Sequence, residues 1–295
     1  MKRYIGLSLL VCLFAGGAAT LAAQAGGDGA MPPPKVLVVT REFLKPGKAG
    51  SPHEKTESAF VAAMTAAKWP TRYIGTDALS GASRSVFFMG YDSFAAWEKD
   101  TLATYGNTTL AASLDRAFIA DGELLSSVET SVLAYREDLS LNPNVNIATM
   151  RYFEAISFHT RPGHEMEWEA IAKMYVDNYA KANPDGHWAT YQAMYGARSG
   201  GAYVVIIPMK SLAEVDTGMA AGKKFMEQLG ESGMKKMMEM SAASTEWTES
   251  NLLMFNPKIS YAADAWVKTD PGFWKPKAAA AAPKAAAKPA PKPAQ

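Results

Sequence analysis

The chain has 295 residues, of which 48% are hydrophobic and 20% charged, and its formal net charge at pH 7 is +1. This composition is typical of a globular protein, and it provides no basic surface of the kind that binds nucleic acid. The single cysteine, Cys12, lies near the N-terminus, which excludes disulfides, zinc–thiolate sites and thiol nucleophiles from the rest of the chain.

Residues 1–25 have the pattern of a secretory signal peptide. Lys2-Arg3 forms the basic start, residues 5–14 the apolar run, and small residues at 23–25 the cleavage site. We expect cleavage at this point, a periplasmic or secreted mature protein, and a linker over residues 26–34. An uncleaved anchor is the alternative, but glycines dilute the apolar run.

The next part of the chain contains an internal repeat. Several segments recur in the same order roughly 110 to 120 residues later. The clearest pairs are residues 128–135 with 248–255, residues 85–89 with 203–207, and Pro46-Gly47 with Pro162-Gly163. Since the order is preserved, we expect both copies to fold alike.

Hydrophobic alternation, helical spacing and turn residues predict the same elements in each copy. The first copy is predicted to contain strand 36–43, helix 52–68, strands 72–78 and 84–90, helices up to about residue 125, and strand 129–136. The second is predicted to contain strand 147–159, helix 164–182, strands 188–197 and 202–208, helical region 211–241, and strand 250–255.

Strand, helix, strand, strand, helix, strand is the order of the ferredoxin-like motif, which leaves one sheet face bare. We therefore expect an α+β fold with ferredoxin-like repeats over residues 35–141 and 142–262. Their antiparallel sheets would pack face to face as a fused pseudo-dimeric α/β barrel, with helices outside.

Two segments carry a resemblance to a known family. Residues 161–169, with sequence Arg-Pro-Gly-His-Glu-Met-Glu-Trp-Glu, follow a predicted strand, and strand 204–207 leads into the helix start at 211–214. Over roughly residues 35 to 260 the chain resembles the dimeric α/β-barrel superfamily, in particular antibiotic-biosynthesis-monooxygenase-like domains, with two repeats fused. The resemblance implies a fold and a candidate cavity. Because the superfamily includes small monooxygenases, haem-handling enzymes and members without assigned activity, it does not imply a reaction.

Residues 263–295 are rich in lysine, proline and alanine and are predicted to be disordered. The simplest interpretation is a solvated spacer. The alternative is an electrostatic contact with anionic material of the cell envelope.

Two histidine–glutamate segments superficially resemble metal-binding motifs. His53-Glu54-x-x-Glu57 and His164-Glu165-x-Glu167 each lack the second histidine that a zincin requires four residues after the first. Acidic residues in a first helical turn are explained by the helix dipole. We therefore predict no metal site and no cofactor.

The weak candidates for metal ligands are His159, His164 and His187, which could converge at one rim, and a methionine stripe. Met234, Met237 and Met238 could bind Cu(I) through their thioethers, although methionines at this spacing are also typical of a buried helix face.

Polar residues within apolar strands are the remaining candidates for a site. Glu154 is the clearest, because burial would raise its pKa and fit it for proton transfer or hydrogen bonding. Pairing with Arg151 or Arg41 is the structural alternative. The predicted ligand-binding residues are Arg151, Phe153, Glu154, Tyr191 and Tyr203.

The leading hypothesis is non-catalytic binding of a small apolar or aromatic ligand in a barrel cavity. The alternative is a cofactor-independent monooxygenase-like enzyme in which Glu154 or His159 transfers a proton, and a copper or haem carrier is the third possibility. At this point the sequence leaves open whether the chain is an enzyme, which ligand it binds, and whether it assembles into homo-oligomers.

Overall fold

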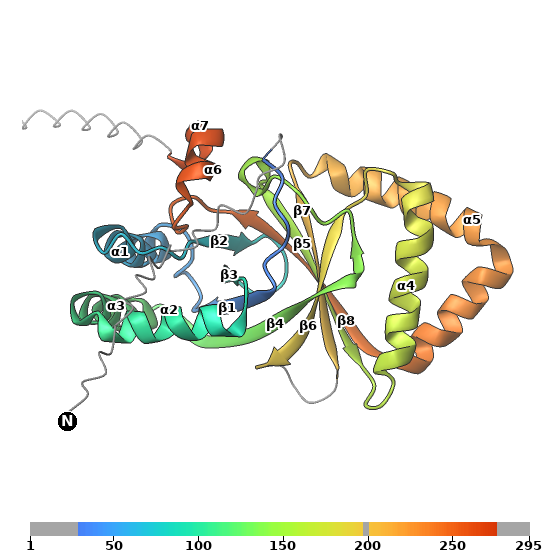
Figure 1. The fold of residues 1–295 in the computed structure, drawn as a ribbon, viewed down its shortest axis with the longest axis horizontal. Helices are drawn as coiled ribbons and strands as arrows, with labels where there is room; N and C mark the ends of the chain where they lie inside the picture. Colours follow the sequence, from blue (N-terminus) through green and yellow to red (C-terminus); the bar gives the residue numbers. More distant parts are fainter. Residues whose placement is uncertain (1–28, 197–200, 276–295) are drawn as a thin grey trace, which may run out of the picture.

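The computed structural model describes residues 29–196 and 201–275 (Figure 1). The predicted signal peptide, with Cys12, and the lysine- and proline-rich residues from 276 onward lie outside the described residues.

The described chain has two halves with similar element order. The first half comprises β1 (Val36–Leu44), α1 (Ser51–Ala66), β2 (Tyr73–Ala78), β3 (Arg84–Tyr91), α2 (Phe94–Gly106), α3 (Thr108–Gly122) and β4 (Leu125–Leu141). The second half comprises a 3-10 turn (Ile147–Thr149), β5 (Tyr152–Thr160), α4 (Glu165–Ala182), β6 (Trp188–Tyr195), β7 (Ala202–Met209), α5 (Ala213–Ser244) and β8 (Thr245–Phe255).

The eight strands form a closed antiparallel barrel in the order β1-β3-β2-β8-β5-β7-β6-β4. Two seams join the halves, where β4 pairs with β6 and β2 pairs with β8. The α+β class and the closed barrel are confirmed, and this is the architecture expected from the resemblance to the dimeric α/β-barrel superfamily.

Side chains fill the interior of the barrel. Alternate residues of each strand point inward, as the period of two requires, and Phe153 packs edge-on against Phe88 and Phe255, with ring centroids 5.0 and 4.5 Å apart. A space of only about 40 Å³ remains between residues such as Val39 and Ile206. The barrel interior is therefore a packed core.

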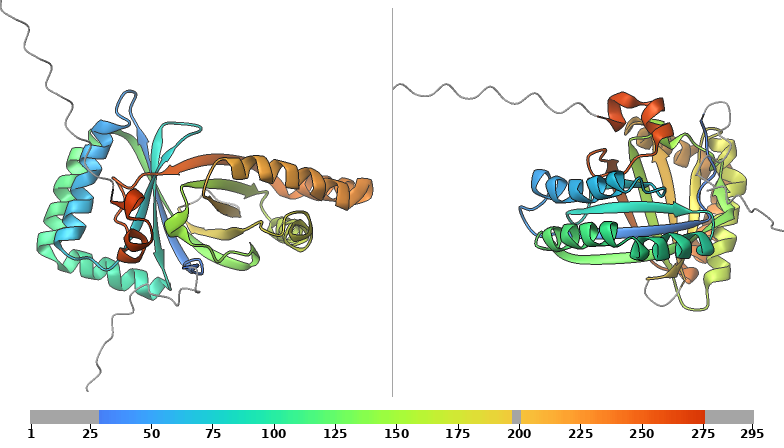
Figure 2. Two further views of the ribbon diagram at one scale, coloured as in Figure 1. Left: turned by 90° about the horizontal axis from the view of Figure 1, so that it is seen from above. Right: turned by 60° about the vertical axis from the view of Figure 1, so that its left-hand side comes forward.

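The helices cover the outer faces of the sheet on opposite sides of the barrel (Figure 2). The helices of the first half pack closely on their strands through Phe60, Trp69, Tyr73 and Leu110. The starts of α2 and α3 follow from local capping, because the side chains of Ser93 and Asn107 accept backbone N–H groups of the first turn.

The barrel is closed at one end by α6 (Asp264–Thr269) and α7 (Pro271–Trp274). Trp274 is 4% exposed, and its indole N–H donates to the Ala148 carbonyl at 2.9 Å. The prediction of disorder from residue 263 onward is wrong for these helices, because Trp266, Phe273 and Trp274 supply the apolar surface that the lysine- and alanine-rich residues lack.

Two strand predictions differ from the structure at their ends. The strand expected from residue 147 begins at Tyr152, because Asn146 caps a short 3-10 turn instead. The last strand of each half is longer than predicted, since β4 continues from its pairing with β1 into the seam with β6. Within the described ranges, none of the helices combines the length and hydropathy needed to cross a membrane.

Candidate functional site: a cavity beneath helices α4 and α5

A cavity of about 1220 Å³ lies in the second half, between the outer face of the sheet and helices α4 and α5. Side chains of β5, β6 and β7 form its floor, and the two helices form its walls. Pockets for organic ligands usually measure about 300–1,000 Å³, so this cavity has ample room for one. The predicted ligand space is therefore displaced from the packed barrel interior to the opposite face of the sheet.

Glu154 lies on the floor of this cavity. The alternation of β5 places Glu154, Ile156 and Phe158 on the cavity side and Phe153 and Ala155 in the barrel. Among the described residues the Glu154 carboxylate has no hydrogen-bond or ion-pair partner, so the alternative of a pair with Arg151 or Arg41 is not formed. Burial raises its pKa above the ordinary value, because desolvation disfavours the charged form.

Aromatic side chains of α4 form the wall nearest to Glu154. Burial, followed by the neighbouring Tyr179 and the charge of Glu154, raises the pKa of Tyr175 to about 12. Tyr175 stacks on Tyr179 with centroids 5.2 Å apart and packs against Phe225 of α5 at 4.4 Å. These rings give the cavity flat apolar surfaces, which favour aromatic ligands.

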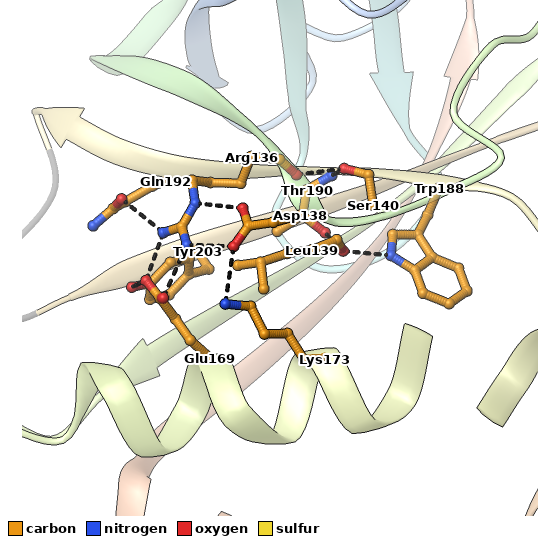
Figure 3. A network of polar contacts seen from close by, with 10 residues as sticks. All are labelled: Arg136, Asp138, Leu139, Ser140, Glu169, Lys173, Trp188, Thr190, Gln192 and Tyr203. Atoms are coloured by element: carbon orange, nitrogen blue, oxygen red, sulfur yellow. Dashed lines mark hydrogen bonds and ion pairs between the residues drawn. The ribbon is translucent and has the colours of Figure 1, made fainter. Parts of the chain in front are cut away.

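An ion-pair network fastens α4 to the barrel beside the cavity (Figure 3). Arg136 of β4 binds both carboxylate oxygens of Glu169 on α4, at 2.5 and 2.9 Å, and both of Asp138, at 2.9 and 3.0 Å. The hydroxyl of Tyr203 donates to Glu169 at 2.7 Å. Hydrogen bonds from Arg136 lower the pKa of Glu169 and lower that of Asp138 to about 2.

A second group of hydrogen bonds in Figure 3 fixes the floor where the pairing of β4 and β6 is irregular. The Leu139 carbonyl accepts from the indole N–H of Trp188 at 2.9 Å and from the hydroxyl of Thr190 at 2.7 Å. The Thr190 amide donates to the hydroxyl of Ser140. Since Trp188 and Thr190 both line the cavity, this part of its floor is held rigidly.

The outer wall of the cavity depends on a break in α5. Gly230 has φ 65° and ψ 178°, a conformation essentially restricted to glycine. The break turns the second part of α5 sharply (Figure 1). Met237 and Met238, which follow the break, line the cavity.

The structure separates the five predicted ligand-binding residues, and only Glu154 lines the cavity. Phe153 and Tyr191 belong to the barrel core. Arg151 instead forms an ion pair with Asp270. Tyr203 is fully buried behind Trp168, with the two rings stacked 4.1 Å apart. The alternation of strand residues between two apolar faces explains the separation, because both faces are covered and the sequence does not distinguish them.

The three candidate histidines are not brought together as a set of metal ligands within the described ranges. The ring of His159 stacks on Trp247 at 3.5 Å, and His164 lies at the start of α4 beside Glu167. His187 lines the cavity, but its two ring nitrogens face the carbonyls of Asp185 and Pro208 at 3.0 and 2.7 Å. Neither nitrogen of His187 is therefore free to ligate a haem iron in this cavity.

The candidate methionines lie along the part of α5 that follows the break. Met237 packs with the aromatic cluster around Phe225, whereas Met238 is largely exposed. Met234 is not among the cavity-lining residues. Their common feature is a place on the helix that forms the wall, and the exposure of Met238 departs from the interpretation of the stripe as a buried helix face.

A second group of polar side chains, in the first half, was not predicted as a site. Glu42, His53, Glu57 and Asp121 are all buried and lie together. The spacing of His53 and Glu57 on one helix face, together with a charge at Glu42 in an apolar strand, was the available signal. Asp121 comes from a different helix and carried no such signal.

No protein-family model matches the chain, and no curated protein matches it by sequence. A protein from Fusobacterium nucleatum subsp. nucleatum that is proposed to be a monooxygenase aligns over 76% of this chain and 94% of its own, with 12% identity and a TM-score of 0.49. An anthrone oxidase-like protein aligns over 75% and 92%, with 14% identity and a TM-score of 0.49. A heme-binding protein from Thermus thermophilus aligns over 78% and 95%, with 11% identity and a TM-score of 0.42. At such identities and TM-scores these likenesses carry no argument about what this chain binds or catalyses.

Proposed function

We propose that the chain binds a small, largely apolar or aromatic molecule in the cavity beneath α4 and α5, with one polar group of the ligand meeting Glu154. The observation that supports this most directly is a large apolar cavity containing a half-buried carboxyl group without a described partner. A buried polar group is stable when it is hydrogen-bonded, so a ligand hydroxyl at Glu154 would supply the missing partner.

We further propose that the chain is a tandem pair of ferredoxin-like repeats fused as a pseudo-dimer. The strand order within the barrel supports this, because the first half contributes β4-β1-β3-β2 and the second contributes β8-β5-β7-β6. Export to the periplasm or outside the cell remains a proposal based on residues 1–25. N-terminal sequencing of the protein from its native compartment would test it, and an intact N-terminus would contradict it.

The second candidate function is cofactor-independent oxygenation. The raised pKa of Glu154 favours it, since a carboxylate with higher proton affinity is a better general base. A reduced phenolic substrate would lose two hydrogens and gain one atom of O2, and the other oxygen atom would leave as water. Oxygen consumption that is abolished in Glu154→Gln would support this candidate. Ligand binding without oxygen consumption would support binding and contradict oxygenation.

Binding is tested with the purified protein and 2-naphthol as the probe. We expect 2-naphthol to raise the melting temperature and to show a saturable signal in calorimetry. Ile207→Trp fills the cavity floor and should abolish binding, whereas Glu154→Gln should weaken it by about 10- to 100-fold if the hydrogen bond to the carboxylate is lost.

The matched control is Glu167→Gln, which removes a carboxylate from the exposed start of α4, outside the cavity. Its affinity should equal that of the unmodified protein. Unchanged binding in Ile207→Trp would place the ligand elsewhere and contradict the proposal.

A further inference from the structure

Four buried side chains of the first half converge from three elements. Glu42 comes from β1, His53 and Glu57 from α1, and Asp121 from α3. Their exposed fractions are 6%, 2%, 3% and 1%, and one ligand atom from each lies within 4.8 Å of the others. The group lies between the outer sheet face and the helices, on the opposite side of the barrel from the cavity.

The spacing of the four side chains suits a single metal ion. From Nε2 of His53 the distances to carboxylate oxygens are 3.1 Å to Glu42, 3.5 Å to Asp121 and 3.8 Å to Glu57. Zinc binds nitrogen and carboxylate oxygen at about 2.0–2.2 Å, so two ligands of one tetrahedral ion are about 3.3–3.6 Å apart. The observed spacing brackets this value.

A hydrogen-bond relay orients the histidine for ligation. The hydroxyl of Ser85 donates to Asp77 at 2.7 Å, and the same oxygen lies 3.3 Å from Nδ1 of His53. Because the Ser85 proton is directed at Asp77, Nδ1 of His53 is the donor to Ser85. Nε2 faces the three carboxylates and lies 3.1 Å from Glu42, so a bound metal ion would take the place of the proton that Nε2 shares with that carboxylate. Metal-binding histidines are generally held in this way by a partner of the other ring nitrogen.

An unpartnered atom points into the same space. Oε1 of Glu57 is buried without a hydrogen bond to any described residue, and it is directed toward Nε2 of His53 at a distance beyond hydrogen bonding. The hydroxyl of Tyr73 is also buried and unpartnered, and its pKa is raised by burial and by the neighbouring charges of Glu57 and Glu42. Buried polar atoms normally have partners, so an orphaned carboxylate oxygen indicates a missing one.

The charges of the group are unbalanced when all three carboxyl groups are ionised. Within the described ranges, no lysine or arginine forms an ion pair with Glu42, Glu57 or Asp121, and His53 is their common partner. Three carboxylates around one imidazole leave excess negative charge in a buried place, which is costly unless it is compensated.

We propose that Glu42, His53, Glu57 and Asp121 bind one divalent transition-metal ion. Imidazole nitrogen with carboxylate oxygens is a donor set that suits Zn²⁺ and Mn²⁺. Four protein ligands form a closed site, which is characteristic of a structural metal. The ion ties β1, α1 and α3 together, and this site is independent of the ligand cavity in the other half.

The experiment uses the full chain without a polyhistidine tag. The protein is unfolded in denaturant that contains a chelator, freed of the chelator, and refolded with Zn²⁺, Mn²⁺ or Co²⁺, because a buried site is loaded during folding. The refolded protein is then desalted and its metal content is measured by elemental mass spectrometry. We expect one ion per chain and a melting temperature above that of protein refolded with chelator. The proposal would be overturned if none of the three metals were taken up at one ion per chain.

Variants then locate the bound ion. Glu57→Gln and Asp121→Asn should each weaken metal binding by more than about tenfold. Loss of a residue that only hydrogen-bonds to a metal ligand already costs about 10- to 100-fold. The matched control is Glu54→Gln on the same helix, because Glu54 pairs with Lys258 at 2.8 Å and lies outside the group. Circular dichroism verifies that each variant folds.

Unchanged uptake in both Glu57→Gln and Asp121→Asn would place the ion elsewhere and overturn the proposal. If a variant does not fold, the melting temperatures of the unmodified protein with metal and with chelator still decide, and equal values contradict a structural ion. The cavity variant Ile207→Trp should bind metal normally, so failure of the ligand proposal leaves this result intact.

Discussion

The two halves place different chemistry at the same position of the barrel. In the first half Glu42 lies opposite Ser85 in the strand ladder, and in the second half Phe158 lies opposite Tyr203. Each pair meets a side chain from the first turn of the helix above. Glu42 and Ser85 contact His53, whereas Phe158 and Tyr203 pack on Trp168 at 5.2 and 4.1 Å.

The two halves also differ in the number and the path of the helices that cover the sheet. Three helices cover the first sheet face, and their residues fill the space beneath them. In the second half a single helix, α5, takes the place of α2 and α3, and its break at Gly230 leaves the cavity. The strand framework common to both halves fixes where a site can form, while the covering helices and a few side chains decide which kind of site forms there.

The prediction with the largest effect on stability tests whether side chains fill the space beneath the helices in the first half but leave it partly empty in the second. Phe60→Ala should lower the free energy of unfolding by about 3–5 kcal/mol, because Phe60 is buried and its ring packs on Phe118 at 4.8 Å. Met237→Ala should cost clearly less, since Met237 borders a space that is already empty. Urea unfolding measures both, and equal costs would show that the halves are packed alike.

The next effect concerns the ion pairs that hold α4. Arg136→Met should lower the free energy of unfolding by about 1.5–3 kcal/mol, which is the range for hydrogen bonds to charged groups. Combining it with Glu169→Gln in a double-mutant cycle should show strong coupling. The control is Lys173→Met, whose contact with Asp138 at 3.2 Å is half exposed and should contribute at most about 1 kcal/mol. Additive effects of Arg136 and Glu169 would refute the role of this pair.

The break in α5 gives a prediction of opposite signs at two glycines. Gly230→Ala should destabilise the protein by about 1–3 kcal/mol, because its backbone conformation excludes a side chain even though no atom would clash. Gly222→Ala, in the regular part of the same helix, should stabilise it by about 0.5–1 kcal/mol. Thermal unfolding distinguishes them. Stabilisation by both changes would mean that α5 can straighten and that the cavity does not depend on the break.

The smallest effect is a pH dependence that arises from the ion pairs holding α4. The pKa of Asp138 is lowered to about 2, so its contribution to stability is present above its ordinary pKa near 3.8 and is lost as the pH falls toward 2. NMR titration should find this low value and should find it returned toward the ordinary one in Arg136→Met. An ordinary pKa in the unmodified protein would contradict the ion pair.

Much of the fold follows from local sequence. The strand and helix positions were predictable because β5 alternates and α4 repeats its apolar residues at helical spacing, and these periods depend on neighbouring residues alone. The ends were less predictable. The extension of β4 into the seam with β6 depends on a partner strand from the other half, and the ordering of residues 264–274 depends on the open barrel end that Trp274 covers.

The candidate sites were predictable only in part. Glu154 was identified because a charge in an apolar strand is unusual, and its place in a cavity agrees with that interpretation. Its assignment to one site with Phe153 and Tyr191 was wrong, because strand neighbours point to opposite sides of a sheet that is covered on both faces.

The repeated order of elements, the cysteine-free core and the unusual charges at Glu42 and Glu154 can be read from the amino-acid sequence, since all of these are properties of residue type and spacing. Three features depend on how the elements pack in space: the filled barrel interior, the cavity outside it in the second half, and the approach of Asp121 to Glu42, His53 and Glu57 in the first. Cavities and clusters arise where elements distant in sequence meet, and the packing of those elements is set by barrel closure and by the path of each covering helix.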